Sequence, residues 1–327
     1  MASDVITALV SIVTPVYRPG NDLLDLGLAI EAQTYREFEW IVVDDGSGEA
    51  YSEVFDRLTA LGIERLQVVR LTENVGQARA RNVGLQHSKG SFIKFVDADD
   101  LLDAHHLQSL LEVSLGFGQK ARIAFAPTRH LFAATGESHV NRSYVSISAL
   151  PEEQLARLLE APFLSHCGAL FPVQLLRDLG GYDPSLTTDE DGDLLIRVLL
   201  SDWAFVAAPE CNYIYRHGNT SERVSIDDGI AKFEARRRVC LKVTEHYRSL
   251  GVTVPAKISA SLCRRIDAIA VRAFRKHSDF SRGMFELAAS VLSSRSRSGS
   301  VPERVIRRLF GISVMLGFKE LYAKFRR

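Results

Sequence analysis

Acidic side chains gather where a short apolar segment ends, in the sequence FVDADD at residues 95–100. Asp97 and Asp99 are separated by one residue, so both carboxylates can converge on one hard cation and on the ribose hydroxyls of a ligand. Mg²⁺ and Mn²⁺ prefer oxygen ligands and keep positions open for phosphate oxygens. The alternative is structural, because Asp99 or Asp100 can cap a helix that begins near Leu101. The spacing alone leaves both interpretations open.

A second acidic pair, Asp44 and Asp45, stands in the sequence DDGS directly after another apolar segment. These carboxylates can accept hydrogen bonds from a base N–H or a ribose hydroxyl. Asp-Gly and Gly-Ser are equally ordinary turn residues, so a plain turn is the alternative. Tyr17, at the end of the first apolar segment, can stack on a nucleobase or simply pack.

A basic helix face is expected in NVGQARARN at residues 74–82, with Asn74 as its cap. Arg81 can bind a phosphate through two nitrogens, and Arg79 is the weaker candidate. The alternative is a helix face exposed to solvent.

A third acidic group, DEDGD at residues 189–193, places four carboxylates in five positions. Acidic residues favour a helix N-terminus, but four are more than capping needs. Crowding of like charge raises carboxylate pKa values, which suits a general base. His217 follows a further strand, where a lone histidine is more often structural than a ligand.

These residues need a scaffold, and the sequence alternates between strand-like and helix-like segments. The expected strands are residues 8–16, 38–43, 66–71, 92–96, 122–132, 144–147, 203–207 and 213–215. The expected helices are residues 22–34, 51–61, 77–86, 107–115, 152–159 and 191–200. The alternation predicts an α/β fold with a mostly parallel central sheet and flanking helices. Ligands of such sheets bind beyond the carboxyl ends of the strands, where the acidic clusters fall.

From about residue 227 the chain becomes helical and poor in strands. We therefore expect two parts, residues 1–225 and a helical C-terminal extension at 226–327. Residues 293–300 (SSRSRSGS) read as a hinge. Residues 302–324 combine basic and apolar side chains at helical spacing. This helix can lie on an anionic membrane or pack on the rest of the protein with its basic face solvated.

Composition narrows the class of protein. The 40 basic and 40 acidic residues give no net charge, which excludes the global basic field that gathers nucleic acid. The four cysteines form no CxxC pair and fit buried, reduced thiols. We expect a cytoplasmic protein, since neither a signal peptide nor an apolar run near 18 residues is found. A nicotinamide dehydrogenase and a P-loop enzyme are disfavoured because GxGxxG is missing after the first strand and GxxxxGK[ST] is missing altogether.

Six segments in order resemble glycosyltransferase family 2, the inverting enzymes of GT-A fold. They are SIVTPVYRPG, EWIVVDDGSGE, NVGQARARNVGL, FVDADD, GGYDPSLTTDEDGDLLIRVLL and YRHGNTS, which together span roughly residues 9–225. The resemblance implies a GT-A catalytic domain with a nucleotide-binding half at residues 1–103 and an acceptor-binding half at 104–225.

The resemblance also implies a role for each matching residue. The nucleotide would be bordered by Thr14, Pro15, Tyr17, Asp44, Asp45, Arg81 and Asp97, with Asp97 at the ribose. Asp99 would bind a Mn²⁺ or Mg²⁺ ion that holds the diphosphate, and His217 would be a further contact to metal or diphosphate. Asp191 matches the general base, and Glu190 lies beside it on the acceptor side. Gly192 departs from the bulkier aromatic residue of many relatives, which leaves the acceptor's shape open.

The implied reaction moves a sugar from a nucleotide-diphosphate donor, a UDP-sugar being the commonest, to a hydroxyl of a glycan or a lipid-linked acceptor with inversion. Synthesis of a cell-surface polysaccharide or glycolipid is the expected setting, with a peripheral location at the inner face of the membrane if the C-terminal helix binds lipid. Two alternatives stay open. One is a sugar-1-phosphate nucleotidyltransferase, although a glycine-rich, basic first loop is lacking. The other is a nucleotide-sugar-binding protein without catalysis.

Overall fold

The computed structural model describes residues 8–116, 121–132, 135–141, 150–217 and 229–293. The chain divides into two compact units, Met1–Ile226 and Asp227–Arg327. The strand expected at residues 144–147 and the basic helix expected at 302–324 lie outside the described residues.

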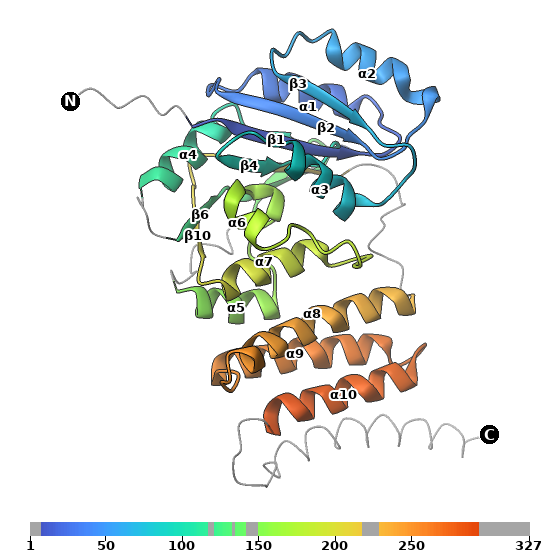
Figure 1. Ribbon diagram of the computed structural model, residues 1–327, viewed down its shortest axis with the longest axis vertical. Coiled ribbons are helices and arrows are strands. Elements are labelled where there is room, and N and C mark those ends of the chain that lie inside the picture. The colour runs from blue at the N-terminus through green and yellow to red at the C-terminus, as the bar shows by residue number, and fades with distance from the viewer. Residues whose placement is uncertain (1–7, 117–120, 133–134, 142–149, 218–228, 294–327) are drawn as a thin grey trace. The chain divides into compact units, whose positions relative to one another are not determined.

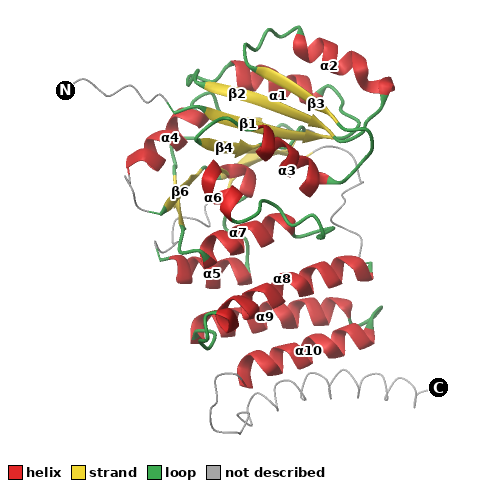
Figure 2. Ribbon diagram, in the orientation of Figure 1, coloured by secondary structure: helices red, strands yellow, loops and turns green. Residues whose placement is uncertain are grey.

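A central sheet organises the first unit (Figures 1 and 2). Within the described residues it has seven strands in the order β10-β6-β9-β4-β1-β2-β3. The strands are β1 (Val10–Val16), β2 (Phe38–Asp44), β3 (Leu66–Arg70), β4 (Phe92–Phe95), β6 (Arg122–Phe125), β9 (Ala169–Pro172) and β10 (Ala204–Ala207). Only β9 runs antiparallel to its neighbours β4 and β6, so the sheet is mixed but mostly parallel, as the sequence predicts.

Helices cover both faces of β1 and β2. Successive side chains of a strand point to opposite faces. Val13 faces α3 (Gln77–His87), where a Cβ added to Gly84 would stand 2.2 Å from its Cγ1. On the other face the Trp40 ring lies against Gly27 of α1 (Asp22–Glu31), at 3.5 Å from a Cβ placed there. At Gly27 the Cβ would come closest, at 2.6 Å, to Leu61 Cδ1, the end of a flexible side chain, so the close approach requires glycine at position 84, where stiff, β-branched Val13 is met.

The remaining helices of this unit complete its packing (Figure 1). Helix α2 (Ser52–Thr59) lies against α1, α4 (His106–Gly116) against β6 and β9, and α6 (Val173–Asp178) against β9. Helix α5 (Pro151–Glu160) packs between β10 and α7 (Glu190–Leu200). Two single turns, η1 (Glu49–Tyr51) and η2 (His166–Gly168), are 3₁₀-helical, and η2 contacts both β4 and α7.

A smaller sheet has the strand order β5-β11-β7-β8. It shows that one predicted strand is in fact two strands, which belong to different sheets. The sequence predicts one strand over residues 122–132, but the chain leaves the central sheet after β6 and enters the small one as β7 (Thr128–Phe132). Pro127 stands between them and has no N–H to continue a ladder. The other strands are β5 (Leu101–Leu102), β8 (Ser138–Val140) and β11 (Tyr213–His217).

The second unit is helical. Helices α8 (Ile230–Ser249), α9 (Ala256–Ala273) and α10 (Ser278–Ser293) follow one another, and α9 packs against both others. The buried side chains of this second unit include Phe233, Val239, Leu262, Ile266 and Met284. In the described part of the chain no helix has both the length and the apolar character needed to cross a membrane.

Candidate active site

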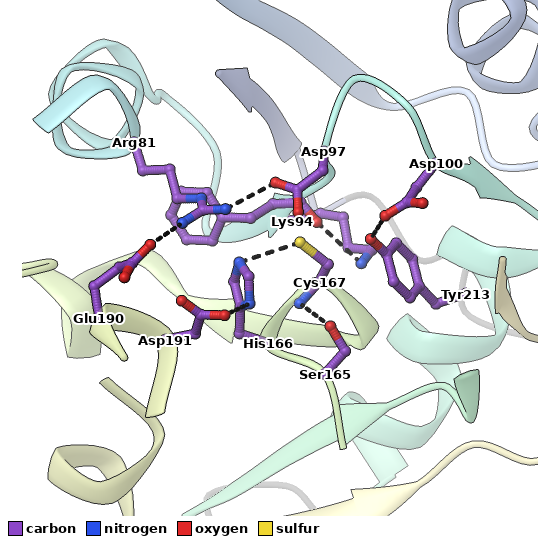
Figure 3. A network of polar contacts seen from close by, with 11 residues as sticks. Arg81, Lys94, Asp97, Asp100, Ser165, His166, Cys167, Glu190, Asp191 and Tyr213 are labelled. Carbon is purple, nitrogen blue, oxygen red and sulfur yellow. Dashed lines mark hydrogen bonds and ion pairs between the residues drawn. The ribbon is translucent and has the colours of Figure 1, made fainter. Parts of the chain in front are cut away.

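Four separate segments bring ionisable side chains to one place beyond the end of β4 (Figure 3). Asp97 follows β4, and Arg81 points from α3 toward it. The first turn of α7 provides Glu190 and Asp191, and η2 provides His166. Side chains up to 110 positions apart in the sequence, from Arg81 to Asp191, thus surround one site.

Arg81 is the cation at the centre of this cluster. Its side chain is 1% exposed, its Nη2 donates to Asp97 Oδ1 at 2.8 Å, and its Nη1 lies 3.5 Å from Glu190 Oε1. The guanidinium also lies over the Tyr182 ring, 5.3 Å from its centroid. Burial alone would lower the pKa of Arg81, but the negative charge of Asp97 and of further groups such as Asp191 together outweighs that effect and raises it. The alternative prediction, that Arg81 lies on a helix face exposed to solvent, is therefore wrong.

Two donor atoms of Arg81 make no hydrogen bond within the protein. Its Nε and Nη1 are buried and have no hydrogen-bond partner, and neither has the Tyr182 hydroxyl. Buried polar groups of this kind usually find a partner, because an unmade hydrogen bond there is unfavourable by about 1–3 kcal/mol. These donors are suited to an anionic ligand such as a phosphate.

Asp191 pairs with a histidine that the sequence did not single out. Its Oδ2 lies 3.3 Å from His166 Nδ1, and the other ring nitrogen, Nε2, lies 3.1 Å from Cys167 Sγ. Burial opposes the charge of His166, yet Cys167 and Asp191 raise its pKa to about 10. Asp191 is held as a carboxylate: burial would raise its pKa, but His166 and then Arg81 lower it below the usual range.

The effect of carboxylate crowding is therefore found on Glu190 and not on Asp191. Burial and the neighbouring Asp191 raise the pKa of Glu190. The expectation that crowding raises the pKa of the base is wrong for Asp191, because the charges of His166 and Arg81 lower it. Asp193, a third member of the acidic group, is buried and bonded to Arg197 at 2.8 Å, which makes it structural.

Asp99 and Asp100 have different surroundings although they are adjacent. Asp99 is exposed, and burial of part of its carboxyl group together with Asp97 raises its pKa. Asp100 is fully buried, accepts from the Tyr213 hydroxyl and from Arg216 N at 2.9 Å, and has its pKa raised to about 8 by burial and then by Asp97. The next helix begins only at His106, so neither residue caps it.

The carboxylates of Asp44 and Asp45 accept hydrogen bonds from backbone N–H groups. Asp44 Oδ1 accepts from Ser47 N at 3.0 Å, which makes a turn. Asp45 accepts from Val75 N at 2.7 Å and from Gly76 N at 3.0 Å, directly ahead of α3. Asp45 thus fixes the loop that leads to Arg81, and any contact of either carboxylate with a nucleotide stays a prediction.

The residues at the end of β1 are divided between core and surface. Thr14 is buried, and its hydroxyl accepts from Trp40 Nε1 at 3.0 Å; Pro15 is buried beside it. Tyr17 is 47% exposed, with the Arg18 guanidinium 5.0 Å from its ring centroid. Of the three, Tyr17 is the side chain available to stack on a base.

His217 lies in the small sheet, where its side chain has aromatic partners. Its Nε2 is 2.9 Å from His130 Nδ1, and its ring stacks on Phe132 with centroids 4.3 Å apart. The preceding Arg216 forms ion pairs with Asp22 at 3.1 Å and Asp25 at 2.9 Å. In the described part of the chain, the group of three or more potential ligands with all ligand atoms within 4.8 Å of one another contains neither Asp99 nor His217.

A reciprocal contact joins α3 to the segment ahead of α7. Asn82 Nδ2 donates to Tyr182 O and Tyr182 N donates to Asn82 Oδ1, both at 2.8 Å. Gly181 has φ of 70°, and a Cβ there would stand 2.4 Å from Asn82 Oδ1. This contact places the Tyr182 ring beneath Arg81.

Sequence reasoning missed Lys94, His166 and Cys167. Lys94 is fully buried in β4, where burial lowers its pKa to about 8 against the opposing effect of nearby acidic groups. A lysine inside an apolar strand was the visible signal for Lys94. The adjacent His166 and Cys167 ahead of the apolar run ALFP were the signal for the other two.

Residues 11–180 match the family model described as "Glycosyl transferase family 2". Glycosyltransferase GlyA of Streptococcus pneumoniae is 25% identical over 214 residues, which cover 63% of this chain and 30% of that protein. The putative teichuronic acid biosynthesis glycosyltransferase TuaG of Bacillus subtilis is 34% identical over 104 residues, 32% of this chain and 41% of that one. The match thus spans less than half the length of either relative.

Solved structures share the fold. S. aureus TarS in complex with UDP-GlcNAc has a TM-score of 0.63 at 20% identity, over 90% of this chain and 82% of that one. Mannosyltransferase PcManGT from Pyrobaculum calidifontis, in complex with GDP-Man and Mn²⁺, has a TM-score of 0.55 at 18% identity, over 98% and 84% of the two chains. The predicted GT-A fold is confirmed by this likeness.

Proposed function

Because this chain belongs to glycosyl transferase family 2, we propose that it transfers a sugar from a nucleotide-diphosphate donor to an acceptor hydroxyl with inversion at the anomeric carbon. The observation that carries the proposal is the common position of Asp97 and Asp191, both of which act on the buried Arg81. A binding protein without catalysis needs no such pairing of an ionised carboxylate with a buried histidine.

In this proposal Asp191 is the general base. His166 and Arg81 keep it ionised, so it is ready to accept a proton across the neutral pH range. A carboxylate of low pKa is a weak base toward a free hydroxyl. It therefore takes the proton late, when attack on the anomeric carbon has already made the acceptor oxygen acidic. One displacement from the face opposite the nucleotide inverts the configuration.

Arg81 and Asp97 would hold the donor. Asp97 keeps 25% of its side chain exposed while one oxygen is bonded to Arg81, so the rest of the carboxylate can meet a ribose or sugar hydroxyl. The Nε and Nη1 of Arg81, which make no hydrogen bond within the protein, would stabilise negative charge that develops on the departing diphosphate. Glu190 holds Arg81 from the acceptor side.

A divalent ion, Mn²⁺ or Mg²⁺, fits at Asp99. That side chain is exposed, and its pKa is raised by partial burial of the carboxyl group and then by the negative charge of Asp97, which a cation would relieve. Solved GT-A neighbours were crystallised with Mn²⁺. Bound there, the ion would act as a Lewis acid toward the diphosphate. His217 as a second ligand stays a prediction, since its ring is bonded to His130.

For the donor and the acceptor we propose a nucleoside-diphosphate sugar, with a UDP-sugar first, and a growing glycan or a lipid-linked saccharide. The support is in the names of relatives and structures, which include teichuronic acid and O-antigen biosynthesis and complexes with UDP-GlcNAc and GDP-Man. A location at the inner face of the membrane, reached through residues 302–324, completes the proposal. Sedimentation with anionic liposomes, with a chain ending near residue 293 as control, tests that location.

The decisive test is a panel of nucleotide-sugars with Mn²⁺ or Mg²⁺. A true donor stabilises the protein by mass action and raises its Tm only when the metal is present. Release of the nucleoside diphosphate from that donor, with or without an added acceptor, then shows catalysis. Stabilisation without any release, across the whole panel and both metals, would identify a binding protein and overturn the proposed activity.

A further inference from the structure

One cluster beside the proposed base has a different ligand chemistry from Asp99. Asp97, His166 and Cys167 offer a carboxylate oxygen, an imidazole nitrogen and a sulfur that all lie within 4.8 Å of one another. His166 and Cys167 are buried, and Figure 3 shows both side chains beside Asp97. We propose that these three side chains form a second metal site, which takes a thiophilic divalent ion such as Zn²⁺ and, when occupied, blocks the transfer reaction proposed above. The blocking part rests on that proposed function, and the binding part does not.

The ligand set suits zinc and not magnesium. Thiolate and imidazole select softer ions, whereas Mg²⁺ takes oxygen ligands. With Zn–S of about 2.3 Å and Zn–N of about 2.0 Å, the two ligand atoms of a tetrahedral site stand roughly 3.5 Å apart. Cys167 Sγ and His166 Nε2 are now 3.1 Å apart, so they need to separate by only a few tenths of an ångström. Asp97 provides a third ligand, and water can fill the fourth position.

Asp191, the residue that would orient the metal-binding histidine, already lies beside it. A histidine that binds metal almost always donates its other ring N–H to a carboxylate or carbonyl, which fixes the tautomer and the ring orientation. His166 Nε2 faces the sulfur while Nδ1 lies 3.3 Å from Asp191 Oδ2. The imidazole is therefore oriented with the nitrogen that would bind the ion turned toward Cys167.

The local charge favours a divalent cation. Three carboxylates, those of Asp97, Glu190 and Asp191, lie within ion-pair distance of Arg81 or His166. The ion would bind a neutral imidazole and a thiolate, so any proton on these ligands leaves when the ion arrives.

Occupation would disable the proposed reaction because Asp97 cannot serve both purposes. One oxygen of Asp97 is held by Arg81 at 2.8 Å, and the ion would take the other. The ribose or sugar hydroxyl would then lose its acceptor, and donor binding would weaken. Zn²⁺ should therefore compete with the donor, whereas an ion at Asp99 should assist it.

Binding is tested with Co²⁺ in excess Mg²⁺, which keeps the hard site filled. Co²⁺ bound to a thiolate shows a sulfur-to-metal charge-transfer band in the near ultraviolet. We expect the band in the wild type, its loss in Cys167→Ser, and at least a tenfold weaker Zn²⁺ affinity in that variant by competition with a chelator. The matched control is Cys211→Ser, which removes an equally buried thiol and should keep both band and affinity.

No band in the wild type, or an unchanged Zn²⁺ affinity in Cys167→Ser, would overturn the site. If Cys167→Ser fails to fold, His166→Gln removes a second ligand and should weaken Zn²⁺ binding to the same extent. Inhibition is measured separately, as the rise of the donor KM with Zn²⁺. A band without inhibition would retain the site and overturn its effect on transfer, and the band needs no active enzyme, so its result is independent of the proposed function.

Discussion

His166 and Asp191 form an ion pair at 3.3 Å, in which a buried imidazole faces a carboxylate that keeps 44% of its side-chain surface exposed. The buried partner is fixed by its surroundings, while the exposed partner is open to solvent. Such a pair orients the carboxylate and keeps it ionised.

Asp191→Asn removes the proposed base with little change of shape. We expect kcat to fall by about 10²–10⁴-fold, the usual contribution of a general base, while donor affinity measured by calorimetry stays within about twofold. Asp202→Asn, an exposed change away from the site, is the control. An equal loss of donor affinity and kcat would contradict the role.

His166→Gln keeps a polar group but removes the positive charge beside Asp191. We expect kcat to fall by about 10–100-fold with the donor KM nearly unchanged, because a displaced base affects chemistry more than binding. His106→Gln is matched, since His106 is also buried and bonds a backbone carbonyl, Asn212 O, at 2.9 Å. Both variants should lose stability. Equal kinetic loss in the two would indicate a purely structural histidine.

Arg81→Lys replaces a planar, branched cation with a point charge. A lysine cannot bridge Asp97 and Glu190 together, so we expect a Tm lower by several degrees, equivalent to about 1–3 kcal/mol, and weaker donor binding. Arg79→Lys, on the exposed side of the same helix, should leave both unchanged. Differential scanning fluorimetry and a donor titration give the two readings. A Tm unchanged by Arg81→Lys would refute the bridging role.

Asp99→Ala should remove the dependence of donor binding on the metal ion. In the wild type we expect Mn²⁺ to strengthen donor binding, because the ion links a carboxylate to the diphosphate. In the variant the donor affinity should be the same with Mn²⁺ and with a chelator, and Asp97 and Asp191 should still be in place. Calorimetric titration of the donor with and without metal is the measurement. A persistent metal effect would move the ion away from Asp99.

Lys94 makes stability depend on pH above neutrality. Its pKa is lowered from 10.5 to about 8 in the folded protein, so between these values the unfolded chain binds more protons, and the free energy of unfolding rises with pH. The full change is on the order of 3 kcal/mol. Lys94→Met should remove this rise, so the variant's stability relative to wild type should fall from pH 8 to pH 10.5. Urea unfolding at each pH measures it, and a parallel pH dependence in both proteins would contradict the assignment.

The strands that lead to Asp44 and Asp97 could be predicted because each is a short, mostly apolar segment followed by polar residues. Strand β9 could not, since four apolar residues without periodicity fit a strand or a helix equally. The burial of Arg81 was also hidden, because only tertiary structure brings Asp97 and Glu190 to either side of it. His166 was missed for the same reason: nothing near it in the sequence shows that Asp191 will lie beside it.

The contact between Asn82 and Tyr182 limits where this protein can be altered. The side-chain amide of Asn82 exchanges two hydrogen bonds with the backbone of Tyr182, as paired residues of neighbouring β-strands do. Gly181 has no Cβ, and this leaves room for the amide. A library aimed at new acceptors would lose folded members at positions 82, 181 and 182, whatever the substrate. Diversity is better directed at exposed positions that make no such contact.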